Sequence, residues 1–487
     1  MLKHITLVMS ILCSLPFSSF GQILLTYEKL ETYSIQDLEN MATNAGIPPS
    51  LIGIETSVDF YKVTYLTPYL HPDSLVQASG AIVLPTNPFC SYPLMGYGHG
   101  TQSKRSKVAS NRDGGQWEIG ALFASTGYVV SLPDYLGMGD ADPRVPIHPY
   151  THAYSQANTM INMLRSAREL CATEDVELND QVFLFGYSQG GGATVAAVKE
   201  IEENYSNEFQ IAGSAPMSGA YDLIDAQVDL ILSENVYPTP GYLPYVVLAY
   251  QSVYGNLYSD VSEFLKSPYD SIIPELFFEG NTGINSINNQ CPPVPKDIVV
   301  DSTLDAFIND PNHPLKLNLQ ENDLITGWYP TTPMKLIYCQ GDDQVSYLNS
   351  ENAYNTWSNA GAPFLSKADL GSSDHQGCAS FAILLARSYF DSIAVNCALD
   401  VPDLEAEGYQ LTPNPATESF TIRCPETKHF KNAALELFDG SGRLTRRVVG
   451  LVGNMVHFRR EDIPSGLYYY QISDGADILS KGKVILE

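Results

Sequence analysis

Short apolar runs recur along most of the chain, and they alternate with longer amphipathic segments. The run "VFLFGY" at 182–187 is apolar without alternation, which is typical of a strand buried on both faces of a parallel sheet. The segments 153–170 and 378–395 instead have the periodicity of helices. Further runs predict strands at 59–67, 75–85, 93–98, 127–132, 209–215, 334–339 and 364–369. Because strands that alternate with helices are joined by right-handed crossovers, we expect an α/β fold with a mostly parallel sheet, preceded by one antiparallel pair.

The alternation is interrupted at about 222–330, which is rich in Tyr, Pro and Leu and shows no strand signal. Such an insert is either a cap over an active site or a surface excursion with its own small core.

A Pro-containing acidic linker at 399–410 then separates the main body, 23–398, from a second unit at 411–487. The short alternating segments and Gly-Ser turns of this unit predict a small all-β sandwich.

Residues 1–22 combine one Lys, an apolar core and small residues, which predicts a secretory signal peptide.

The net charge is -28, and the unit at 411–487 holds only nine of the 55 acidic residues but ten of the 27 basic ones. The main body therefore carries the acidic excess, which disfavours nucleic acid and anionic membranes as partners. Export permits disulfides, whose pairing stays open, and no C-x-x-C spacing indicates a metal. We expect neither a metal nor a cofactor.

A serine stands where the strand 182–187 meets the following helix, in the sequence Gly186-Tyr187-Ser188-Gln189-Gly190. Glycine on both sides allows a sharp backbone reversal, because a Cβ there would collide with the neighbouring element. The pattern resembles the G-x-S-x-G nucleophile elbow of the α/β-hydrolases. An ordinary serine in a structural turn is the alternative interpretation.

A nucleophilic serine needs a histidine base, and in α/β-hydrolases the chain order is serine, acid, histidine. Four histidines follow Ser188. His313 lies inside the insert, and His429 and His457 belong to the C-terminal unit. His375 remains, in a loop between the last predicted strand and the last helix, where the base is expected.

The acid is expected after the seventh strand, where the chain reads "CQGDDQV" at 339–345. This resembles the hydrolase pattern G-D-x-x-V, which selects Asp342 as the acid and Val345 as the last position. Asp343 is the alternative. Asp374, beside the histidine, is better suited to cap the following helix.

Acyl transfer also needs N–H donors for the oxyanion that forms in the transition state. The backbone N–H of Gln189, directly after the serine, is one candidate. The other should come from the loop after the third strand, "GHGT", which offers Gly100 and Thr101. His99 in the same loop is expected to be buried and bonded to loop carbonyls.

Two further segments, "GYVVSLPDYLGMGDA" and "IAGSAPMSGAYDL", resemble secreted lipases of the Candida antarctica lipase A type and their bacterial relatives. The resemblance covers roughly 55–395. It implies an α/β-hydrolase fold with a cap and a serine carboxylic-ester hydrolase that forms an acyl-enzyme, with Ser188 as nucleophile, His375 as base and Asp342 as acid. The insert would bind the acyl chain of a lipid or small-molecule ester in an apolar pocket.

The C-terminal phrases "LTPNPATESFTI" and "DIPSGLYYYQISDGADILSKGKVILE" resemble the sorting domain of the type IX secretion system in Bacteroidetes. This resemblance implies the type IX secretion machinery as a partner, and a secreted or outer-membrane cell-surface protein. A carbohydrate-binding sandwich is the alternative for this unit.

Other functions stay open for the main body. One is a serine peptidase of the aminopeptidase type, which would need carboxylates in the cap to hold the substrate amine. Another is an esterase that trims acetyl or feruloyl groups from polysaccharides. A non-catalytic binding protein on a hydrolase scaffold is the alternative from a different class.

Overall fold

The computed structural model describes residues 22–87, 90–114, 116–395, 408–425, 428–438, 444–475 and 477–486. The signal peptide predicted at 1–22 lies outside these residues except for its last position, and the linker predicted at 399–410 lies outside them up to 407. Within the described ranges, no helix is long and apolar enough to cross a membrane.

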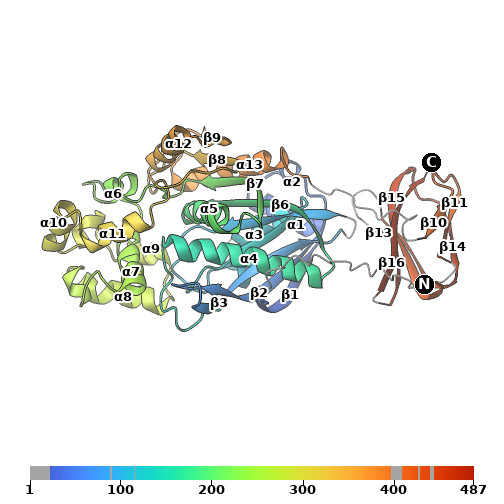
Figure 1. Ribbon diagram of the computed structural model, residues 1–487, viewed down its shortest axis with the longest axis horizontal. Helices are drawn as coiled ribbons and strands as arrows, with labels where there is room; N and C mark the ends of the chain where they lie inside the picture. The colour runs from blue at the N-terminus through green and yellow to red at the C-terminus, as the bar shows by residue number, and fades with distance from the viewer. Residues whose placement is uncertain are drawn as a thin grey trace, which may run out of the picture.

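A nine-stranded sheet forms the core of the main body (Figure 1). The strand order is β1-β2-β3-β5-β4-β6-β7-β8-β9; the pairs from β1 to β5 are antiparallel and the pairs from β5 to β9 are parallel. The strands are β1 (Leu24–Tyr33), β2 (Val58–Pro68), β3 (Leu75–Pro85), β4 (Ser91–Gly98), β5 (Val129–Pro133), β6 (Glu177–Tyr187), β7 (Gln210–Met217), β8 (Met334–Tyr338) and β9 (Leu365–Asp369). The predicted mostly parallel α/β sheet is confirmed.

Strand β1 was not predicted. Its sequence "LLTYEKLETY" is largely exposed at the edge of the sheet, so it carries no buried apolar run. By contrast, the second half of β6 is buried on both faces, which is why its sequence is apolar throughout.

Helices cover both faces of this sheet, and their buried side chains belong to two separate hydrophobic clusters. One face carries α4 (Ala153–Thr173), α5 (Gln189–Glu200) and α12 (Leu348–Ala360). The other carries α1 (Ile35–Asn44), α2 (Pro49–Ile52), α3 (Gln116–Ala124) and α13 (His375–Asp391). Helix α13 begins three residues before its predicted start, because Asp374 caps it through the Gly377 N–H at 2.7 Å.

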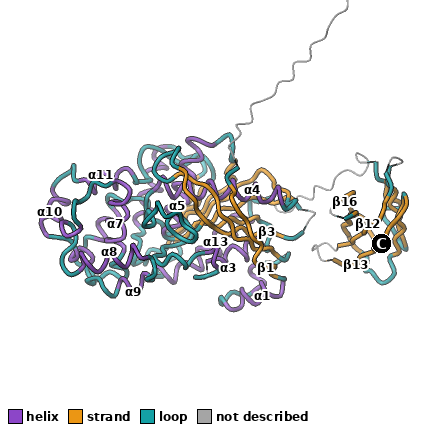
Figure 2. Tube along the Cα trace, turned by 90° about the horizontal axis from the view of Figure 1, so that it is seen from below, coloured by secondary structure: helices purple, strands orange, loops and turns teal. Residues whose placement is uncertain are grey.

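The insert between β7 and β8 is helical. It contains α6 (Ala226–Ile231), α7 (Tyr242–Tyr254), α8 (Tyr269–Glu279), α9 (Ile284–Asn288), α10 (Asp301–Asn309) and α11 (Pro314–Glu321). These helices gather at one end of the sheet (Figures 1 and 2) and share a third hydrophobic cluster, which includes Tyr245, Phe277 and Phe307. The insert therefore packs around a cluster formed mostly by its own side chains, to which Ile147 and Tyr150 of the main body contribute.

The C-terminal residues form two antiparallel sheets, with strand orders β10-β11-β14 and β13-β12-β15-β16. Their strands are β10 (Gln410–Thr412), β11 (Ser419–Arg423), β12 (Phe430–Phe438), β13 (Leu444–Gly453), β14 (Met455–Arg459), β15 (Gly466–Asp474) and β16 (Asp477–Leu486). Side chains of both sheets, such as Phe420 and Leu435, belong to one hydrophobic cluster, so the two sheets pack on a common core.

Candidate active site

Ser188 lies at the sharp turn between β6 and α5. Its φ of 60° is a left-handed conformation that non-glycine residues rarely adopt. The turn needs glycine on both sides: a Cβ on Gly186 would lie 2.4 Å from the carbonyl oxygen of Gly190, and one on Gly190 would lie 1.9 Å from that of Gly98. The strained serine thus sits on a turn packed tightly against the end of β4.

Asp342 and His375 form a buried pair. The Asp342 Oδ2 atom lies 2.7 Å from His375 Nδ1, and the two side chains are only 1% and 3% exposed. The other carboxylate oxygen accepts hydrogen bonds from the N–H groups of Gln344, at 3.0 Å, and Val345, at 2.8 Å. With both oxygens bonded, the carboxylate holds the imidazole so that its Nε2 atom is left for another partner.

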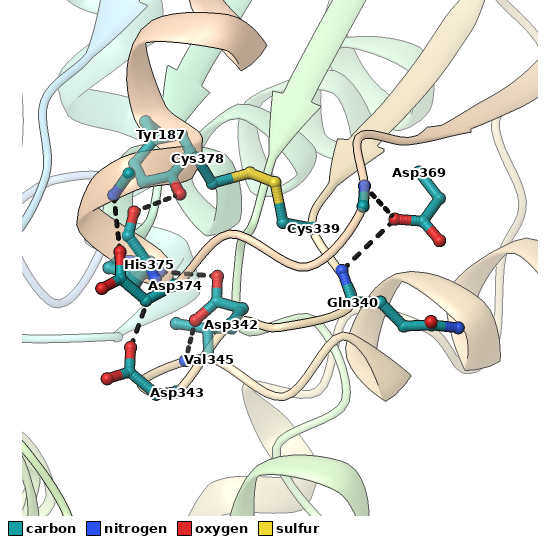
Figure 3. Close-up of a disulfide and its surroundings, with 12 residues drawn as sticks. Tyr187, Cys339, Gln340, Asp342, Asp343, Val345, Asp369, Asp374, His375 and Cys378 are labelled. Carbon is teal, nitrogen blue, oxygen red and sulfur yellow. Dashed lines mark hydrogen bonds and ion pairs between the residues drawn. A yellow bond between two sulfur atoms is a disulfide. The ribbon is translucent and has the colours of Figure 1, made fainter.

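Two further neighbours support the backbone of His375 (Figure 3). Asp343 Oδ1 accepts the backbone N–H of His375 at 3.2 Å. The Tyr187 hydroxyl donates to its carbonyl oxygen at 2.7 Å. Burial raises the pKa of Tyr187, which keeps this hydroxyl protonated and able to donate. Asp343 therefore supports the histidine backbone, while Asp342 is bonded to the ring nitrogen Nδ1.

A disulfide joins the two segments that carry this pair. Cys339 follows β8 and Cys378 lies in the first turn of α13, with a Cα–Cα distance of 6.0 Å (Figure 3). The backbones are close beside it as well, because a Cβ on Gly341 would lie 2.2 Å from the Ser372 carbonyl oxygen. The bridge thus fixes the acid loop to the start of the helix that carries the histidine.

Ser188 lies close to this pair. Tyr187, the preceding residue, donates to the His375 carbonyl, and the two rings are 5.0 Å apart. Ser188 also lines the same cavity as Val345, which is bonded to Asp342. Among the described residues, Ser188 Oγ has no hydrogen-bond partner, so the hydroxyl and the imidazole are not bonded to each other. Such contacts are often long without a substrate.

The loop after β4 lies against the serine. The ideal Cβ position of Gly100 is 3.8 Å from Ser188 Cβ. The Gly100 N–H, however, donates to Gln116 Oε1 at 2.9 Å. The Gly100 N–H is thus engaged by a side chain, which leaves the Thr101 N–H as the other candidate donor of this loop. The Thr101 N–H has no acceptor in the described part of the chain, and its hydroxyl lies 3.0 Å from Tyr150 Oη.

His99 and Gln189 also have defined environments. The ring nitrogens of His99 lie 2.7 Å from the Gly100 carbonyl and 3.2 Å from the Asp134 carbonyl, as predicted for a buried loop histidine, and burial lowers its pKa. Gln189 is the first residue of α5, so its N–H has no intrahelical acceptor. Its side chain contacts His148 at 2.6 Å, a partner that no local sequence pattern indicated.

An apolar cavity of about 110 Å³ opens beside the serine. Ser188 and Gln189 line one part of it, and side chains of the insert line most of the rest; these include Ile231, Leu232, Val246, Phe264, Leu304, Phe307, Leu315 and Leu319. The cavity therefore lies between the serine and the insert, and its wall offers few polar atoms.

The insert is hydrogen-bonded to the acid loop through Gln344. The carbonyl oxygen of Gln344 accepts the Tyr237 hydroxyl at 2.6 Å and the Gln227 side chain at 3.1 Å. Its Oε1 atom accepts the Tyr242 hydroxyl at 3.3 Å. Because Gln344 itself donates to Asp342, the insert is linked to the carboxylate through a single residue.

A second set of bonds links the insert to the loop at 99–105. The Arg105 N–H donates to the Gly280 carbonyl at 2.8 Å, and the Ser103 hydroxyl donates to the Thr282 carbonyl at 2.8 Å. The Tyr245 hydroxyl donates to the Gln102 carbonyl at 3.0 Å. The insert therefore helps to hold the loop that lies beside the serine.

Comparison with known proteins agrees with this arrangement. The sequence model described as "Secretory lipase" matches residues 117–382. A candidate hydrolase from Legionella pneumophila is 25% identical, with a TM-score of 0.70 over 76% of this chain and 98% of that one. The rice cell wall degrading esterase LipA from Xanthomonas oryzae is 28% identical, with a TM-score of 0.68 over 76% of this chain and 99% of that one.

A more distant likeness bears on the fold alone. Candida antarctica lipase A in its closed state is 16% identical, with a TM-score of 0.58 over 78% of this chain and 85% of that one. No curated protein sequence matches the chain.

Proposed function

This chain belongs to the secretory lipase family and is a carboxylic-ester hydrolase, and we propose that it cleaves esters with Ser188, His375 and Asp342 as a catalytic triad. The observation that carries this proposal is the buried 2.7 Å bond between Asp342 and His375, next to a serine held at a φ of 60°.

In the proposed mechanism, Ser188 Oγ attacks the ester carbonyl while His375 Nε2 takes its proton. The Asp342 carboxylate accepts the Nδ1–H and stabilises the imidazolium that forms. The N–H groups of Gln189 and Thr101 would stabilise the oxyanion, each contributing about 3–4 kcal/mol to the transition state. His375 then protonates the departing alcohol, and it activates the water that hydrolyses the acyl-enzyme.

The apolar cavity would receive the acyl chain. Its lining of Leu, Ile, Val and Phe side chains excludes water and offers no charged group to a peptide amine. These features favour an acyl-chain ester over both an aminopeptidase substrate and a small acetyl group.

The C-terminal sheets would function in export of the protein and not in ester hydrolysis. The sequence of residues 411–487 resembles a type IX sorting domain, and the five residues of the proposed mechanism all lie in the main body. We propose that this unit is recognised by the secretion machinery and that the enzyme acts outside the cell or at its surface. Deleting 411–487 should leave ester hydrolysis intact and abolish export.

Hydrolysis of p-nitrophenyl acyl esters tests the catalytic proposal, with Ser188→Ala as the critical variant. The wild-type protein should turn over and react with a fluorophosphonate probe, and the variant should do neither. Ser218→Ala, another buried serine at a positive φ, is the matched control and should keep activity. Equal turnover by wild type and Ser188→Ala would refute the proposal.

A further inference from the structure

Two buried glutamine side chains near the serine each leave one polar atom without a partner. They are Gln189, 7% exposed, and Gln156 of α4, 4% exposed. Gln189 Oε1 and Gln156 Nε2 are both buried and make no hydrogen bond in the described part of the chain. A buried polar atom left unpaired costs about 1–3 kcal/mol, so the pair needs an explanation.

The orientation of the Gln189 amide follows from its contact with His148. Burial lowers the pKa of His148 to about 3, so the ring is neutral. Its Nδ1 lies 2.8 Å from the Leu136 carbonyl oxygen and must carry the proton. The Nε2 atom is therefore an acceptor, and it can only take a hydrogen from Gln189 Nε2, 2.6 Å away. The amide oxygen of Gln189 must point the other way, unpaired.

Both glutamines line one small cavity of about 20 Å³. It shares Thr151, Gln189, Ala220 and Leu223 with the apolar cavity beside the serine, so the two cavities adjoin each other. The volume of the small cavity is enough for a single oxygen atom with its hydrogen. Its other lining residues, Ala153, Gly192, Asn322 and Leu324, bring no charge.

We propose that this small cavity is a subsite for one hydroxyl group on the acyl chain of the substrate. A hydroxyl both accepts and donates. It can accept from Gln156 Nε2 and donate to Gln189 Oε1, which satisfies the two unpaired atoms together. A carboxylate could not donate to Gln189, an ammonium could not accept from Gln156, and no lining side chain would balance either charge.

The inference rests on the proposed ester hydrolysis and narrows its substrate class to hydroxyacyl esters. Water has the same hydrogen-bonding groups and is the competing source of the hydroxyl. An acyl chain that brings its own hydroxyl replaces that water, whereas an unsubstituted chain leaves it in place.

The test compares p-nitrophenyl octanoate with esters that carry a hydroxyl at each successive carbon of the chain. In the wild-type enzyme one position should raise kcat/KM by about tenfold or more over octanoate. Gln156→Leu should remove that preference while octanoate hydrolysis continues. Asn158→Leu, two residues along the same helix and outside the cavity lining, is the control and should keep the preference.

Several results would overturn the subsite. A flat profile in the wild type would do so, and so would a preference that survives in Gln156→Leu. A crystal structure of a hydroxyacyl phosphonate adduct gives a second readout that needs no variant: the ligand oxygen should lie within hydrogen-bonding distance of both amides, and a water retained there would refute the proposal. Loss of Ser188-dependent hydrolysis of octanoate would instead refute the catalytic proposal.

Discussion

Replacing Cys339 and Cys378 by alanine opens the bridge between the acid loop and α13. The two cysteines are 39 residues apart in the sequence. Closing a loop of this length removes chain entropy from the unfolded state worth about 4 kcal/mol. Both side chains are fully buried, so alanine is preferred over serine, which would bury an unpaired hydroxyl.

Urea unfolding followed by tryptophan fluorescence measures this loss. All three tryptophans, at 117, 328 and 357, lie in the main body, so the signal does not report on the C-terminal sheets. Cys171→Ala is the matched control, because Cys171 is a buried free cysteine on α4 whose truncation removes volume but breaks no bridge.

Activity gives a second readout. Asp342 lies three residues after Cys339, and His375 lies three residues before Cys378. Opening the bridge should therefore lower kcat in buffer without urea, where the variant is still folded. A loss of stability no larger than twice that of Cys171→Ala, together with an unchanged kcat, would refute the reasoning.

Three further predictions concern the site and its surroundings. Asp342→Asn should lower kcat by about 10⁴-fold, since it removes the charge that orients the imidazole. Asp343→Asn should lower kcat by about tenfold or less, because Asp343 contacts only a backbone N–H. Equal losses of kcat would contradict the assignment of the acid. Tyr237→Phe removes the bond to the Gln344 carbonyl and should lower the free energy of unfolding by about 1 kcal/mol in a urea titration, and no change would show that the insert is held by packing alone. Burial lowers the pKa of His148 from 6.5 to about 3, so between these pH values the unfolded chain binds more protons than the folded one. The free energy of unfolding should therefore fall as the pH drops from 6.5 to 4. A urea midpoint of the wild-type protein that stays constant over this range would contradict the burial of a neutral ring.

The sequence predicted the central strands well because most of them are buried on both faces. Such strands must be apolar throughout, and an apolar run is visible without any partner. Strand β1 was not predicted, because the side chains of an exposed edge strand need not be apolar. The helices of the insert were also unassigned, since their apolar faces serve a local core and not the sheet.

The acid–histidine contact could be predicted because chain order and turn chemistry restrict it strongly. A glycine–aspartate turn after a buried strand and a histidine before the last helix leave few choices, and the structure brings Asp342 and His375 together. The hydrogen bonds of the loop at 99–101 could not be predicted in this way. Gln116 engages the Gly100 N–H from a different element, and nothing in "GHGT" encodes that contact.

The contact between Gln189 and His148 shows the same limit. The glutamine is part of the recognisable elbow, but the histidine lies in an irregular segment between β5 and α4. Its neutral ring and its proton position follow from burial and from the Leu136 carbonyl, which only the tertiary structure supplies.

The hydrogen bonds between residues 102–105 and the insert limit how this enzyme could be re-engineered. Grafting a cap from a relative would replace the Gly280 and Thr282 carbonyls and the Tyr245 hydroxyl, and would leave the segment beside Ser188 without these hydrogen-bond partners. A working chimera should therefore transplant 102–105 together with its own cap, so that the two exchange as one module although more than a hundred positions separate them in the chain.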